Sequence, residues 1–136
     1  MNKARCFALL SAFFLAACAS VPDPVFAPAS DVAKHRYRPD GPPEIRLYTV
    51  VSTRNGSGAH SSLLITTETE RILFDPAGSL ALPAVPERYD VLYGITPRVL
   101  GVYIDYHARM TYDVVEQRVK VSAGQAESIA RMAKAY

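Results

Sequence analysis

Asp105 and His107 lie two residues apart, a carboxylate beside an imidazole, and side chains of these two types can hold a metal ion or exchange protons. On a helix, however, residues two positions apart point in different directions, so these two would not share one ligand sphere. We expect His107 to be half-buried and bonded to the backbone or to a tyrosine. The sequence has no pair of histidines at one-and-four spacing and no cysteine pair after Cys18, so we expect no metal site and no cofactor.

Three serines lie close to His60, at positions 57, 61 and 62, and a serine hydroxyl activated by an imidazole is a known type of nucleophile. Ser61 and Ser62 are too close to His60 along a strand to bring their hydroxyls onto its ring. Gly56-Ser57-Gly58 lacks the five-residue nucleophile-elbow pattern and its strand-to-helix turn. We therefore interpret this stretch as a glycine-rich hairpin loop with solvated hydroxyls, and His60 on these grounds alone as a polar residue at a strand end.

The segments around His60 have the pattern of an antiparallel sheet. Residues 44–53 are rich in β-branched and aromatic side chains on two alternating faces, which predicts a strand buried on both sides. Asn55-Gly56 tolerates positive φ at both central turn positions, and such a dipeptide is the strongest short-range hairpin signal. Residues 61–67 are then the returning strand and residues 71–75 a third, and the three are expected to pair as a meander.

The second half of the chain has helical signals at two places. Thr96-Pro97 puts a capping hydroxyl before a proline, which predicts an amphipathic helix over residues 97–109, with a strand as the rival interpretation. Residues 111–121 are expected to form a fourth strand. Ser122 and Gln125 then fit a capping box that opens a second helix.

Between these elements, residues 76–88 contain three prolines and a glycine and are expected to form an irregular loop, followed by a short apolar run of undetermined type at residues 89–94. The fold class is therefore α+β. We expect a small antiparallel sheet of about four strands with two helices, preceded by a signal peptide and a Pro-rich tether.

Two motifs carry a resemblance to a known family: residues 56–65, GSGAHSSLLI, and residues 71–78, RILFDPAG. With the order of hairpin, strand and helix, they resemble the circularly permuted branch of the papain-like NlpC-type cysteine hydrolases. In that branch a histidine opens a core strand, a polar residue on the next strand orients it, and a cysteine comes last, at the start of a later helix. The resemblance implies His60 as the general base and Asp75 as the orienting group.

A hydrolase of this kind also needs a thiol, whose pKa of about 8.5 means that an imidazole has to take its proton at neutral pH. No cysteine follows His60 in the sequence. In the family the nucleophile would lie beyond a helix like residues 123–135. Two alternatives stay open: the chain is a truncated form of a longer enzyme, or it is a remnant scaffold without catalysis.

The N-terminus has the layout of a secretory signal, with Lys3 and Arg5 before an apolar run at residues 7–17. This run is too short to cross a bilayer, which needs about 20 helical residues. Leu15-Ala16-Ala17-Cys18 resembles the bacterial lipobox, which implies cleavage before Cys18 and acylation of its thiol; the alternative is an ordinary secretory signal that ends in cysteine. Ala19 follows the cysteine, where aspartate is absent, and by analogy with enterobacterial lipoproteins this favours delivery to the outer membrane.

These signals divide the chain into three parts: residues 1–17 are a lipoprotein signal peptide, residues 18–43 a lipidated Pro-rich tether, and residues 44–136 a single α+β domain. Whether this domain is complete at its C-terminus stays open. The tether is expected to be extended, because residues 21–43 hold six of the ten prolines. Lys3 and Arg5 account for the excess of 15 basic over 13 acidic residues. The chain from Cys18 is therefore formally neutral, and we expect no binding to nucleic acid.

The expected protein is thus anchored in the bacterial envelope through acyl chains on Cys18, at the outer membrane and facing the periplasm. Because no cysteine follows His60, we expect a non-catalytic binding or structural module. The alternative is a truncated or degenerate permuted NlpC-type hydrolase that cleaves amide or ester bonds of cell-wall peptides or lipids.

Overall fold

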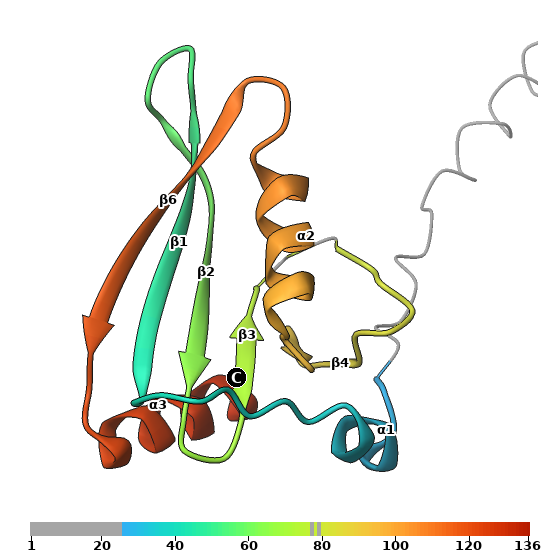
Figure 1. The fold of residues 1–136 in the computed structure, drawn as a ribbon. Helices are drawn as coiled ribbons and strands as arrows, with labels where there is room; N and C mark the ends of the chain where they lie inside the picture. The colour runs from blue at the N-terminus through green and yellow to red at the C-terminus, as the bar shows by residue number, and fades with distance from the viewer. Residues whose placement is uncertain (1–25, 77, 79) are drawn as a thin grey trace, which may run out of the picture.

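The computed structural model describes residues 26–76, 78 and 80–136, and six strands within these residues form one antiparallel sheet (Figure 1). The strands are β1 (Glu44–Ser52), β2 (Gly58–Thr66), β3 (Arg71–Phe74), β4 (Glu87–Arg88), β5 (Val91–Tyr93) and β6 (Tyr112–Lys120). Their order across the sheet is β4-β5-β3-β2-β1-β6. The helices are α1 (Ala29–Lys34), α2 (Pro97–His107) and α3 (Ala123–Ala135). The predicted α+β class is confirmed.

The predicted counts of about four strands and two helices are too low for the described residues, which hold six strands and three helices. The two extra strands, β4 and β5, form a short hairpin at the end of the expected irregular loop. Its two turn residues, Tyr89 and Asp90, both have positive φ, 48° and 58°. That geometry favours glycine, asparagine and aspartate, so Asp90 suits the turn but Tyr89 does not, and Tyr-Asp is not one of the dipeptides that signal a hairpin.

The meander predicted from the first three strands is confirmed, because β2 pairs with both β1 and β3. Of the two turn residues in the Asn55-Gly56 signal, Gly56 has positive φ, 72°, and Asn55 does not. However, β2 begins at Gly58, three residues before the expected start. His60 therefore lies inside the strand, opposite Val50 of β1, and not in a loop before it.

The two longer helices cover opposite faces of the sheet. Leu100 and Tyr103 of α2 belong to one core cluster, with Tyr48, Leu64, Leu73 and Leu92 of the strands. Ala130 and Ala133 of α3 belong to the other, with Ile45, Ile65, Ile72 and Val91. Because strand side chains alternate between faces, His60, two residues before Ser62 and four before Leu64, lies on the α2 face.

The predicted caps explain where both helices begin. The Thr96 hydroxyl accepts a hydrogen bond from the Val99 amide at 3.2 Å, next to a proline at the first helical position of α2. Ser122 and Gln125 make the reciprocal capping box at the start of α3. Such caps satisfy amide groups that have no partner within the helix. The helix expected at residues 97–109 ends two residues earlier, at His107.

The described part of the predicted tether differs from an extended chain. Residues 29–34 form α1, and the segment around it lies against the domain. The Ala27 amide donates to the Glu87 carbonyl at 2.9 Å, and the Arg71 amide donates to the Tyr37 carbonyl at 2.8 Å. Backbone hydrogen bonds with residues of β4 and β3 therefore hold this segment in place.

The signal peptide, Cys18 and the first residues of the predicted tether lie outside the described residues. Among the helices that the structure describes, none combines the length and the apolar character that crossing a bilayer requires.

Candidate functional site

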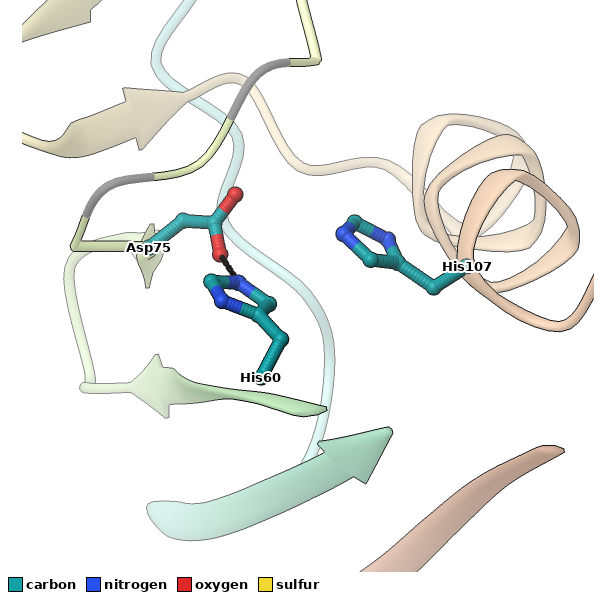
Figure 2. A group of neighbouring side chains, drawn as sticks. All are labelled: His60, Asp75 and His107. Atoms are coloured by element: carbon teal, nitrogen blue, oxygen red, sulfur yellow. Dashed lines mark hydrogen bonds and ion pairs between the residues drawn. The ribbon is translucent and has the colours of Figure 1, made fainter. Parts of the chain in front are cut away.

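His60 and Asp75 lie in direct contact on the α2 face of the sheet, with 2.5 Å between His60 Nε2 and Asp75 Oδ1 (Figure 2). The pairing of β2 and β3 explains the contact. Phe74 lies opposite Leu63, so the next residue, Asp75, continues the register opposite Ser62 and becomes a diagonal neighbour of His60. The resemblance had singled out these two residues, and the structure brings them together.

Asp75 is buried, and three neighbours fix its position. The Tyr103 hydroxyl donates to Asp75 Oδ1 at 2.8 Å, and the Asp75 amide donates to the Asp90 carbonyl at 2.8 Å. Gly78 leaves room for the carboxylate, because a Cβ at that position would collide with Asp75 Oδ2. The carboxylate is thus held from the strand, from α2 and from the following turn.

Tyr103 remains a hydrogen-bond donor at neutral pH. Its side chain is 1 % exposed, and this burial raises the pKa of the phenol, with the negative charge of Asp75 adding to the shift. The hydroxyl of Ser62 acts in the opposite direction on the same pKa but does not reverse the result. The Tyr103 hydroxyl therefore keeps the hydrogen that it donates to Asp75 Oδ1.

His107 lies on the other side of His60. The two imidazole rings are nearly parallel, with 5.3 Å between centroids and 8° between planes. His107 Nδ1 lies 2.9 Å from the Tyr103 carbonyl oxygen, which only accepts, so Nδ1 carries the proton and Nε2 carries the lone pair. The prediction of a half-buried histidine bonded to the backbone is confirmed.

His60, Asp75 and His107 form a cluster in which one donor atom from each residue lies within 4.8 Å of the others. Asp105, the carboxylate considered from sequence, is exposed and belongs to no such group in the described part of the chain. The cluster joins β2, the end of β3 and α2. No spacing along the chain identifies it, although the sequence correctly predicts that His107 is half-buried.

A pocket of about 240 Å³ opens beside the two imidazoles. Its lining residues are Val50, Ala59, His60, Gly78, Tyr106, His107, Arg109 and Tyr112. The Arg109 guanidinium lies over the Tyr106 ring, 4.0 Å from the centroid. A small polar substrate or ligand in this pocket would therefore meet aromatic, imidazole and guanidinium groups.

The three serines near His60 have no nucleophilic arrangement. Ser57 donates to the Asn55 side chain at 2.8 Å in the hairpin loop. Ser61 is exposed on the opposite face, and Ser62 is buried against Tyr103. The interpretation of this stretch as a hairpin loop holds only up to Ser57, because β2 begins at the next residue.

No protein-family model matches this chain, and no match was found among curated proteins or solved structures. The case for function therefore depends on the geometry of the site and on the resemblance of its motifs.

Proposed function

We propose that this domain supplies the acid–base pair of a hydrolytic site of the permuted NlpC type, acting on an amide or ester bond. His60 is the general base and Asp75 the group that orients it. The observation that carries the proposal is the 2.5 Å contact between His60 Nε2 and a buried carboxylate that also accepts from Tyr103. Buried orienting carboxylates of this kind fix the tautomer and direction of a catalytic imidazole.

The proton positions follow from this contact. A carboxylate only accepts, so His60 Nε2 carries the hydrogen and Nδ1 carries the lone pair. Nδ1 then takes the proton of the attacking group, and the imidazolium returns it to the leaving amine or alcohol. His60 lines the pocket, whose volume of about 240 Å³ has room for a small portion of a substrate.

The attacking group in this proposal is a thiol, as the family resemblance implies, and it does not belong to the described residues. The only cysteines in the sequence are Cys6 and Cys18. The Tyr136 ring, at the end of α3, packs edge-on against Phe74 at 5.4 Å, on the face of the sheet opposite to His60 and Asp75. A segment continuing from α3 would therefore have to pass around an edge or an end of the sheet to bring a thiol to His60.

The substrate class and location complete the proposal. Acylation of Cys18 would hold the domain at the bacterial outer membrane, facing the periplasm, where the amide and ester bonds of cell-wall peptides and lipids lie. The alternative function is a lipid-anchored binding module without catalysis. The observation that favours this alternative is the lack of any cysteine after Cys18 in the sequence.

One experiment separates these two functions. Sequencing the gene past the codon for Tyr136 tests whether the frame continues into a segment with a cysteine. If it does, the whole protein should label with a thiol-directed probe and hydrolyse cell-wall peptides, and His60→Ala should lower kcat by about 10²- to 10⁴-fold. Ser57→Ala, in the hairpin loop, is the matched control and should keep full activity. A stop codon directly after Tyr136 would exclude the thiol mechanism.

The proposed lipid anchor at Cys18 can be tested separately. Cys18→Ala should abolish acyl labelling and leave the protein as an uncleaved or soluble precursor. Unchanged membrane partitioning of this variant would exclude the lipoprotein assignment without affecting the hydrolase proposal.

A further inference from the structure

The proposed hydrolytic site uses two residues of the cluster, His60 and Asp75, and gives the third, His107, no role. His107 projects from α2 toward the pair, and its ring stacks on His60 (Figure 2). A base and its orienting carboxylate do not require a second imidazole. Two imidazoles and a carboxylate within 4.8 Å of one another are, however, a donor set that transition metals prefer.

The orientation of His107 matches that of a metal ligand. Its Nδ1–H donates to the Tyr103 carbonyl at 2.9 Å, which leaves the Nε2 lone pair available to the rest of the cluster. Metal-binding histidines generally donate their second nitrogen to a carbonyl or carboxylate in this way, because the bond fixes the tautomer and the direction of the ring.

The Asp75 carboxylate is also oriented by neighbouring groups. Asp75 is 3 % exposed, accepts from the Tyr103 hydroxyl, and has the His60 imidazole as its ion-pair partner. Imidazole carries positive charge only when protonated, so a neutral His60 compensates the buried carboxylate only by its hydrogen bond. A divalent cation at this point would supply the missing charge.

We propose that His60, Asp75 and His107 bind one divalent transition-metal ion of the zinc class. In a tetrahedral site, zinc bonds of about 2.0–2.2 Å place ligand atoms about 3.3–3.5 Å apart. The longest separation in the cluster, up to 4.8 Å, therefore has to shorten by up to about 1.5 Å, and the 2.5 Å between His60 Nε2 and Asp75 Oδ1 has to lengthen by about 1 Å. Three protein ligands leave a further coordination position, and the pocket beside His60 and His107 gives it access to solvent.

The proton balance of binding is simple. The ion takes the position of the hydrogen between His60 Nε2 and Asp75 Oδ1, and that hydrogen moves to Nδ1 when the ring is neutral. When the ring is an imidazolium, one proton is released to solvent. With the metal bound, His60 Nδ1 carries a hydrogen and cannot act as a base, so the metal-bound form is a state of the site other than the hydrolytic one. The inference does not depend on the hydrolytic proposal, because metal binding is measured without any substrate.

The test is a titration of the full chain in detergent with Zn²⁺ and with Co²⁺, whose visible absorption reports coordination. Cys6→Ser and Cys18→Ser remove the competing thiols. We expect one equivalent to bind, with Mg²⁺ failing to compete because it prefers oxygen ligands. His107→Gln should weaken binding by about tenfold or more.

His35 offers the matched control. Its Nδ1 also lies 2.8 Å from a backbone carbonyl oxygen, that of Asp31, but the metal-type cluster of the described residues does not include it. His35→Gln should therefore keep the affinity of the parent chain. His107 is only partly buried, so its substitution should leave the fold intact, as circular dichroism would show. Equal affinity of His107→Gln and parent, or loss of binding in His35→Gln, would overturn the proposal, as would absence of saturable binding below about 1 mM.

Discussion

At the scale of single residues, Asp75 is the point where the site is assembled. Its side chain meets His60 and Tyr103, and its backbone is tied to Asp90 and Gly78. Each of these contacts comes from a different part of the chain. The position of the carboxylate therefore depends on correct packing of the sheet, of α2 and of the following turn together.

The Tyr103 hydroxyl is the contact whose loss is simplest to measure. Tyr103→Phe keeps the ring in the core and removes one donor from the buried carboxylate. We expect the free energy of unfolding to fall by about 1–3 kcal/mol, because a buried charged acceptor loses a hydrogen bond. Urea denaturation at neutral pH measures this change.

Tyr112→Phe is the control for that measurement. Tyr112 lines the same pocket but is 40 % exposed, so water replaces any partner that its hydroxyl loses. Its substitution should change the free energy of unfolding by less than about 0.5 kcal/mol. Equal effects of the two substitutions would show that the Tyr103 hydroxyl contributes nothing specific to the position of Asp75.

At the scale of elements, the segments with local signals could be predicted from the sequence and the others could not. Thr96-Pro97 and Ser122 with Gln125 placed the starts of α2 and α3, because a cap is a property of three or four neighbouring residues. The turn at Tyr89-Asp90 could not be predicted, because Tyr89 has positive φ without favouring it and the dipeptide lacks the glycine that marks a hairpin turn. The three-residue cluster of the site was missed for a related reason: its members meet only after three elements pack.

Alanine substitutions of two glycines test the helix α2 and the packing of the segment around His35. Gly101 lies inside α2, and a Cβ added there would have nothing within 4 Å, so Gly101→Ala should raise the free energy of unfolding by about 0.5–1 kcal/mol through helix propensity. Gly94 has φ +74°, and a Cβ there would lie 2.8 Å from the His35 carbonyl oxygen. Gly94→Ala should therefore lower the free energy of unfolding by about 1–3 kcal/mol.

Thermal and urea unfolding of both glycine variants would measure these opposite signs. A neutral Gly94→Ala would mean that the segment around His35 does not pack against Gly94 in solution. Stabilisation by Gly101→Ala alone would then still support the helical assignment of α2.

At the scale of the whole molecule, the two edge strands of the sheet carry glutamates whose pKa values move in opposite directions. On β4, burial raises the pKa of Glu87, and the negative charges of Asp90 and Asp75 add to the shift. On β6, burial alone would raise the pKa of Glu116, but hydrogen bonds from Arg118 and Tyr48 and the nearby arginine charges outweigh it and lower the pKa. Acid therefore increases the contribution of Glu87 to folding stability and decreases that of Glu116.

The signs follow from linkage between protonation and folding. Glu87 binds its proton more tightly in the folded state, so its contribution to stability is lost as pH rises through its raised pKa. Glu116 binds its proton less tightly in the folded state, so its contribution is present above the ordinary glutamate pKa and lost as pH falls through the lowered one. Glu87→Gln should therefore stabilise the protein at neutral pH, and Glu116→Gln should destabilise it.

Urea unfolding of the parent and both variants, at neutral pH and in acid, gives the comparison. Both differences from the parent should shrink in acid, because protonated glutamate and glutamine are then alike in charge, and both should be small in size since each group keeps much solvent contact. Opposite signs at neutral pH would support the different surroundings of Glu87 and Glu116. The same sign for both would contradict the lowered pKa of Glu116, to which Arg118 contributes from within β6 and Tyr48 contributes through a 2.8 Å hydrogen bond that forms when β6 pairs with β1.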